Sequence, residues 1–110
     1  MNPVDCRELL TLSIEQFETR FKNSPLSRPG RAGLLRNAAI VLGNAKDCSA
    51  ELELIAALDD TEPLLRGAAA WALGQLGTSM AVTAMRRRLT SENNDVVRQE
   101  IEDAIQNYLT

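Results

Sequence analysis

One pattern occurs in three related copies along this chain, at a spacing of 31 to 32 residues. Residues 38–43 read Ala-Ala-Ile-Val-Leu-Gly, and residues 69–74 read Ala-Ala-Trp-Ala-Leu-Gly. Leu65-Arg66 returns as Val97-Arg98, with apolar residues at matched positions downstream of both. A repeat of this length, with two helices per unit, is typical of an α-solenoid, in which each helical hairpin buries its apolar face against its neighbours. The repeat therefore predicts an all-α fold built from stacked hairpins.

The composition agrees with closely packed helices in a single domain. The chain has 110 residues, of which 45% are hydrophobic and only 4% aromatic. Alanine and leucine dominate and favour helices, whereas a sheet protein would be richer in β-branched and aromatic residues. We therefore expect one domain over residues 1–110.

We predict six main helices, arranged as three hairpins, after a short N-terminal turn. The helices are expected at residues 14–22, 34–42, from Asp47 or Ser49 to 58, 64–76, 80–89 and 96–108, and the turn, capped by Asp5, at residues 6–10. The chain then divides into an N-terminal extension, residues 1–12, and hairpins at about residues 13–44, 47–77 and 79–109.

Capping and breaking residues set the predicted helix ends. Ser13 and Gln16 have the spacing of a capping box, and Pro63 suits a first helical position. The other predicted boundaries are stops at Gly43-Asn44 and Gly77, and N-terminal caps at Ser79 and Asp95.

Apolar spacing predicts which side chains face the core. Ile14, Phe17 and Phe21 follow the i, i+3, i+7 pattern of one helix face. The other inward-facing side chains that we predict in the second and third hairpins are Leu52, Ile55, Ala56, Leu58, Val82 and Met85.

The two cysteines fit no metal-binding pattern. Cys6 and Cys48 are far apart in sequence, and the chain has no histidine, so zinc and iron–sulfur spacings are absent. Both are expected to pack as small apolar residues rather than to form a disulfide. The first twelve residues carry charges and do not read as a signal peptide, and no apolar run is long enough to span a membrane. We expect a cytoplasmic protein.

The segment from residue 19 to 46 contains six basic residues and no acidic one, although the whole chain has a net charge of -3. Arg28 and Arg31 are expected in a loop kept irregular by prolines and glycines, and Arg36 and Asn37 on the first turn of the next helix, near its positive end. With Lys22, these residues are the candidate site. Three roles remain open: contact with nucleic-acid phosphates, docking on another domain, and bracing of the first hairpin against the second.

Other charged and aromatic residues favour structural roles. We predict that Arg66 and Arg98 tie the turn of their repeat to the next one through a carboxylate such as Asp60 or Asp95. Packing between repeats is favoured over base stacking for Trp71. The arginines at positions 86–88 point in three directions around a helix, so that at most one or two could join one basic patch.

The pattern Asp-x-x-x-Leu-Leu-Arg-x-x-Ala-Ala-x-Ala-Leu-Gly, which begins at Asp60, resembles HEAT-like repeats. The chain also resembles the C-terminal HEAT-like region of epoxyqueuosine reductase, at Phe17, Phe21, residues 24–26, Arg28, Arg31 and residues 33–39, 42–44 and 62–74. The resemblance implies a protein of tRNA queuosine biosynthesis whose helical repeats help to bind the tRNA anticodon stem-loop.

The resemblance also implies what lies outside this chain. The family enzyme uses cobalamin and two [4Fe–4S] clusters, but the cysteine motifs for the clusters are absent from this sequence. We therefore expect no cofactor and no catalysis in this chain, which would act as a module that binds tRNA or docks on a missing N-terminal catalytic domain. The alternative is a stand-alone scaffold for protein–protein interaction that uses the concave face of the repeats.

Overall fold

The computed structural model describes residues 2–24 and 30–110, and within these ranges the chain is helical without strands. The helices are α1 (Pro3–Leu10), α2 (Ile14–Phe21), α3 (Gly30–Ala45), α4 (Glu51–Ala57), α5 (Pro63–Leu76), α6 (Ser79–Leu89) and α7 (Asp95–Leu109), with a short 3-10 helix at Cys48–Ala50. The predicted all-α solenoid fold is confirmed.

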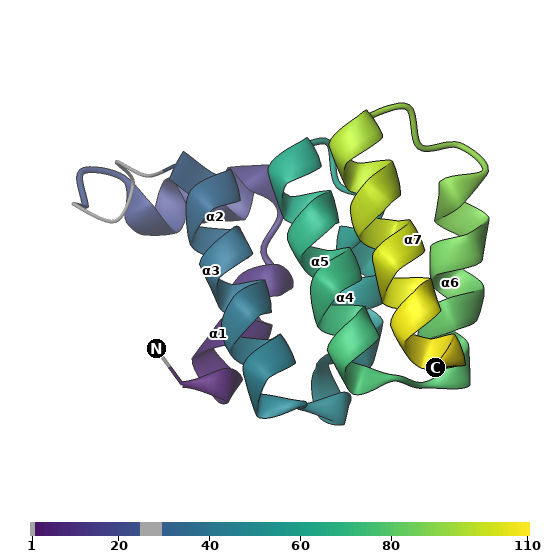
Figure 1. The fold of residues 1–110 in the computed structure, drawn as a ribbon. Helices are drawn as coiled ribbons and strands as arrows, with labels where there is room; N and C mark the ends of the chain where they lie inside the picture. The colour runs from purple at the N-terminus through teal and green to yellow at the C-terminus, as the bar shows by residue number, and fades with distance from the viewer. Residues whose placement is uncertain (1, 25–29) are drawn as a thin grey trace.

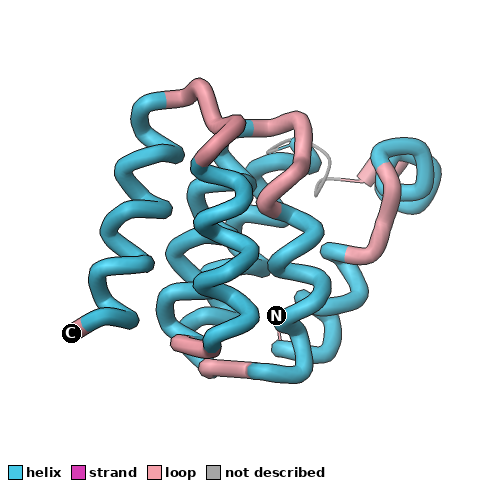
Figure 2. The backbone as a smooth tube through the Cα atoms, turned by 90° about the vertical axis from the view of Figure 1, so that its right-hand side faces the viewer, coloured by secondary structure: helices cyan, strands magenta, loops and turns pink. Residues whose placement is uncertain are grey.

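The helices form two layers, which Figures 1 and 2 show from two sides. Helices α3, α5 and α7 lie side by side in one layer, and α1, α4 and α6 form the other layer behind them. Helix α2 projects at the N-terminal end and has few contacts with α3, which packs mainly against α1 and α5. The division into hairpins at residues 13–44, 47–77 and 79–109 stays a prediction, but the partner of α3 in the second layer is α1.

Small residues set the close approach of α3, α5 and α7. A Cβ atom added to Gly43 on α3 would lie 2.6 Å from Cζ3 of Trp71 and 3.0 Å from the Cα atom of Ala72, both on α5. A Cβ atom added to Gly74 on α5 would lie 2.8 Å from the Cβ atom of Ala104 on α7. The repeated alanines and glycines therefore mark the contacts between neighbouring repeats, because only small side chains fit there.

The N-terminal part is more helical than the sequence indicated. The predicted turn is the helix α1, and its cap is the side chain of Asn2, which accepts a hydrogen bond from the backbone N–H of Asp5. Asp5 is therefore inside the first turn and not the cap. The capping box of Ser13 and Gln16 at the start of α2 is confirmed. Ile14 is exposed, so the predicted apolar face of α2 is wrong at this position.

Helix α3 begins and ends outside the predicted range of residues 34–42. Its described part begins at Gly30, so that Arg31 is on the first turn of a helix and not in a loop. Arg36 and Asn37 are consequently on the second turn, not the first. The helix passes through Gly43 and ends at Ala45, where Lys46 takes a positive φ of 50°. Gly43 is a contact with α5 and not a stop.

The N-terminal caps of two helices differ from their predicted positions by one residue, and the buried face of α4 differs from the predicted one. The caps of α6 and α7 are Thr78 and Asn94, each one residue before the predicted cap. Asp47 caps the 3-10 helix that precedes α4. In α4, Leu52 is 69% exposed whereas Leu54 is fully buried, so the predicted inward face was wrong there. The predicted inward side chains that are exposed are Leu52 and Ala56, whereas Leu58, Val82 and Met85 are buried as predicted.

Two predicted boundaries of α5 are confirmed. Pro63 is its first residue, where a missing backbone N–H breaks no helical hydrogen bond. Gly77 ends the helix with a φ of 63°, in the left-handed region that favours glycine. None of the helices in the described ranges combines the length and the apolar character that crossing a membrane requires.

Candidate functional site

The predicted site residues separate into three groups in the structure. Arg28 lies outside the described residues. Arg31 is on α3 and is held by a carboxylate, whereas Arg36, Asn37 and Lys22 are exposed. The basic segment is therefore not one uniform patch, because its arginines have different surroundings.

Arg31 forms a two-point ion pair with Asp60, which lies in the turn before α5. Its Nη1 atom donates to Oδ2 of Asp60 at 3.1 Å, and its Nη2 atom donates to Oδ1 at 2.5 Å. Burial is the largest effect and raises the pKa of Asp60, but the hydrogen bonds from Arg31 and from the backbone N–H of Glu62, together with the charges of Arg31 and Arg66, hold this pKa below its usual range. With side chains only 16% and 12% exposed, the pair joins α3 to the next repeat. This is the contact that the bracing role would require.

Arg36, Asn37 and Lys22 remain available at the surface. Arg36 donates to Oδ1 of Asn37 at 3.3 Å, and the described residues include no carboxylate paired with Arg36 or Lys22. Arg20 on α2 lies 5.5 Å from the centre of the Phe21 ring. An exposed cation without an acidic partner can offer its full charge to an external anion.

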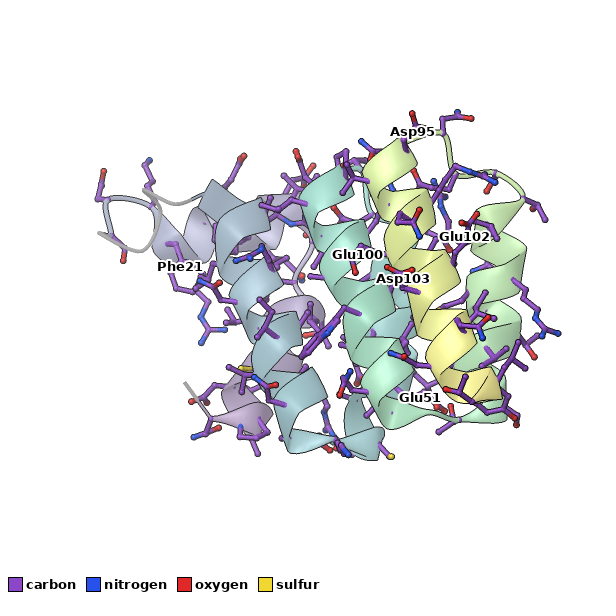
Figure 3. All side chains as sticks on the ribbon, in the orientation of Figure 1. Phe21, Glu51, Asp95, Glu100, Glu102 and Asp103 are labelled. Carbon is purple, nitrogen blue, oxygen red and sulfur yellow. The ribbon has the colours of Figure 1, made fainter. Side chains whose placement is uncertain are left out.

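Charge changes sign across the layer formed by α3, α5 and α7. Helices α3 and α5 contain no acidic residue, whereas α7 carries Asp95, Glu100, Glu102 and Asp103. Figure 3 shows these carboxylates on α7, at the opposite end of the molecule from α2 and Phe21. An anionic partner would therefore be attracted to α3 and repelled from α7.

A second, more buried cluster is built around Glu92, whose role the sequence did not reveal. Arg66 donates from Nε and Nη2 to the two carboxylate oxygens of Glu92 at 2.7 and 2.9 Å, and Arg88 adds a bond at 3.1 Å. The hydrogen bonds from Arg66 lower the pKa of Glu92 to about 2, against the opposing effect of burial. The carboxylate was predicted to be one such as Asp60 or Asp95, but Arg66 reaches Asp60 only at its backbone oxygen.

Arg98 also differs from its prediction. Its Nη1 atom donates to the backbone oxygens of Leu89 and Glu92, both at 2.9 Å, and it forms no ion pair with Asp95 among the described residues. Arg66 and Arg98 therefore share one task, since each ties down the turn that precedes its own helix. Glu92 stands 32 residues after Asp60, and this repeat spacing is the signal that could have identified it.

A groove of about 520 Å³ opens on the face of α3, α5 and α7. Ile40, Leu64 and Trp71 give it apolar walls, and Arg36 and Glu100 line it from α3 and α7. A concave apolar site with a few polar groups is typical of ligand binding. Arg36 thus belongs both to the basic end of the molecule and to this groove.

The two cysteines have different surroundings. Cys6 is fully buried in the core, where burial raises the pKa of its thiol, and Cys48 is exposed, so the predicted packing role is wrong for Cys48. Residues 2–24 and 30–110 contain no group of three or more His, Cys, Asp and Glu side chains that could hold a metal ion. These side chains therefore do not fit an iron–sulfur cluster, which needs clustered thiolates.

Comparisons with known proteins agree with the helical repeats. The family described as HEAT repeats matches residues 30–106. A Geobacillus stearothermophilus protein, named as uncharacterized protein in the gldA 3′ region, is 33% identical over 101 residues, or 91% of this chain and 47% of that protein. The epoxyqueuosine reductase of Bacillus subtilis is also 33% identical over 101 residues, or 91% of this chain and 26% of that protein.

A solved structure extends the match to three dimensions. The crystal structure of epoxyqueuosine reductase with a tRNA-Tyr epoxyqueuosine-modified tRNA stem loop aligns with a TM-score of 0.86 and 31% identity, over 96% of this chain and 28% of that chain. The chain thus spans about half the length of the Geobacillus protein and about a quarter of the Bacillus subtilis reductase. These matches and the two-layered helical fold show that the chain belongs to the HEAT repeat family, in the form found within epoxyqueuosine reductases.

Proposed function

We propose that this chain is a non-catalytic, RNA-binding part of an epoxyqueuosine-reductase-like protein, and that it contacts the anticodon stem-loop of a tRNA. The observation that carries the proposal is the exposure of Arg20 on α2, Lys22 at its end and Arg36 on α3, none of which has a carboxylate partner among the described residues. The relative solved with a tRNA stem loop supports it. The cobalamin and the clusters of the family enzyme would lie in another part of that protein.

In this proposal the exposed residues contact the phosphates. Arg36 and Lys22 would neutralise backbone charge, and Asn37 would add a hydrogen bond to phosphate or sugar, contacts that position RNA without reading its sequence. Arg31 would act indirectly, because its ion pair with Asp60 fixes the first described turn of α3. The carboxylates of α7 would disfavour phosphates on that helix, so that the RNA backbone would lie toward α3.

The test is the salt dependence of binding to a fluorescently labelled anticodon stem-loop, followed by anisotropy from about 50 mM salt upward. Replacing Lys22 and Arg36 together by alanine should weaken binding and reduce the slope of log K against log salt by about 1 to 2, since each lost phosphate contact releases about one counterion fewer. Arg86→Ala is the matched control, because Arg86 is exposed on α6 in the other layer. Binding by the double variant that equals that of Arg86→Ala would refute the proposal.

A second candidate function is docking on the catalytic part of the same protein. A groove of about 450 Å³ lies between α4 and α6, and Leu52 and Met80 in its lining are 69% and 52% exposed. Exposed apolar side chains gathered in this way mark interaction surfaces. Replacing both by glutamate should leave the fold intact and abolish co-purification with the separately expressed catalytic part of a relative. Retained co-purification would exclude this surface.

A further inference from the structure

The groove on α3, α5 and α7 is built on one face of the layer that these three helices form. Leu64, Gly67 and Trp71 follow the i, i+3, i+7 spacing of a single face of α5 and form its centre. Arg36 on α3 and Glu100 on α7 flank that centre from the two sides. The result is an apolar cleft with a cation at one edge and a carboxylate at the other.

Gly67 is unlike the glycines that hold the helices together. At Gly43 and Gly74 an added Cβ atom would collide with the neighbouring helix. At Gly67 it would meet only the Cγ atom of Glu100, at 3.8 Å, which is ordinary van der Waals contact. Glycine inside a helix is destabilising relative to alanine, and no packing contact requires it here. Its effect is to leave the floor of the groove open.

Trp71 gives the groove an aromatic wall. One edge of its ring is fixed, because Cζ3 packs at the position where Gly43 lacks a side chain. The residue is only partly buried and also lines the groove. A ring that is held on one side and reachable from the other is a suitable platform for a flat ligand.

The two charged side chains provide hydrogen bonds of opposite kind. Glu100 has no hydrogen-bond or ion-pair partner within residues 2–24 and 30–110, and the guanidinium of Arg36 donates a hydrogen bond only to Asn37 there. A carboxylate accepts and a guanidinium donates. The edge of a nucleobase carries donors and acceptors together, whereas an apolar peptide side chain carries neither.

We propose that this groove binds one unpaired base of the RNA loop, with Trp71 as stacking surface, Glu100 as acceptor for base N–H groups, and Arg36 bridging from the groove to the adjacent phosphate. The proposal rests on the proposed RNA-binding function and specifies which part of the RNA enters the protein. Unstacked loop bases, held on aromatic rings and hydrogen-bonded at their edges, are the usual targets of sequence-specific RNA recognition. A base also matches the mixed charge of the site better than an apolar peptide side chain does.

The experiment uses Trp71 as its own reporter, since it is the single tryptophan of the chain. The labelled anticodon stem-loop is titrated into the protein while anisotropy reports binding and tryptophan emission reports stacking. A blunt-ended RNA duplex with the sequence of the stem, but without the loop, serves as the RNA control. We expect the stem-loop to quench Trp71 and the blunt duplex to bind without quenching.

Gly67→Leu is the decisive variant, because its side chain would fill the floor of the groove. It should lower affinity for the stem-loop by about 10-fold, within the range measured for loss of one stacked base, and abolish quenching without changing the salt slope. Gln99→Leu, an exposed position on α7 outside the groove lining, is the matched control. Thermal unfolding of both variants checks that the fold is retained.

The outcomes separate this inference from the function on which it rests. Salt-dependent binding with unchanged Trp71 emission, and equal affinities for the two leucine variants, would overturn the base-binding groove and leave the phosphate patch in place. Absence of any RNA binding at about 50 mM salt would refute the proposed function, and this inference with it. A Trp71 response to the separately expressed catalytic part, with none to RNA, would instead identify the groove as a protein-docking site.

Discussion

Glu92→Gln tests the most buried charged side chain in the part of the chain that the structure describes. The Glu92 side chain is fully buried and accepts hydrogen bonds from Arg66, Arg88 and the backbone N–H of Asn94. Glutamine keeps the shape of the side chain but removes its charge and turns an N–H₂ group toward guanidinium donors. The Arg66 side chain, only 11% exposed, then loses its counter-charge.

The pKa of Glu92 gives the size of the effect. Its fall from 4.5 to about 2 corresponds, at about 1.4 kcal/mol per pKa unit, to roughly 3 kcal/mol of preference for the ionised form in the folded protein. Breaking a buried ion pair by removing one partner typically costs about 3–5 kcal/mol, which agrees. We therefore expect Glu92→Gln to lower the free energy of unfolding by about 3 kcal/mol and Tm by roughly 10–20 °C.

The measurement is urea unfolding followed by far-UV circular dichroism at a series of pH values. The stabilising effect of Glu92 is complete above about pH 5 and declines as the pH falls toward 2, because the unfolded carboxyl protonates first. The difference between Glu92→Gln and the parent protein should therefore shrink at low pH. Glu102→Gln, exposed on α7, is the control and should change stability by less than about 0.5 kcal/mol. A loss below about 1 kcal/mol for Glu92→Gln, or one that is the same at pH 3 and pH 7, would refute this reasoning.

Two further predictions concern the contacts between repeats. Gly43→Ala should destabilise the protein by about 1–3 kcal/mol, because its Cβ atom would overlap Trp71, whereas Gly67→Ala should stabilise it by about 0.5–1 kcal/mol; equal effects in urea unfolding would contradict the assignment of Gly43 as a helix contact. Asp60→Asn removes the charge that Arg31 needs and should cost about 1–3 kcal/mol, read as a lower Tm, and an unchanged Tm would show that the pair does not brace α3.

The fold could be predicted because the residues that define the repeat determine where helices form and end from local sequence. Helix formers, capping residues and the 31- to 32-residue spacing all point to stacked helices. Glycine was the ambiguous signal, since the same residue ends α5 at Gly77 and lies inside α3 at Gly43. The match of Gly43 to Gly74 could have resolved it, because both occupy the same place in the repeat, within a helix.

The candidate site could be predicted only in part. The sequence identified the basic segment, and Arg36 and Lys22 are exposed as a site requires. It did not reveal that Arg31 is engaged by Asp60, 29 residues away, because that partner depends on how two repeats stack. The groove at Gly67 was missed for the same reason, since its lining comes from three helices that meet only in the fold.

The arginine–carboxylate pairs have a consequence for how the module comes apart. Arg31 pairs with a carboxylate in the turn before α5, and Arg66 pairs with a carboxylate in the turn before α7. Each arginine therefore has its counter-charge in the following repeat. Unfolding of one repeat would leave a buried guanidinium or carboxylate in the neighbouring repeat without its counter-charge, which is energetically unfavourable. In a linear array whose units contact only their neighbours, such links raise the coupling between units relative to their intrinsic stability. The three repeats should therefore open together, as one cooperative unit.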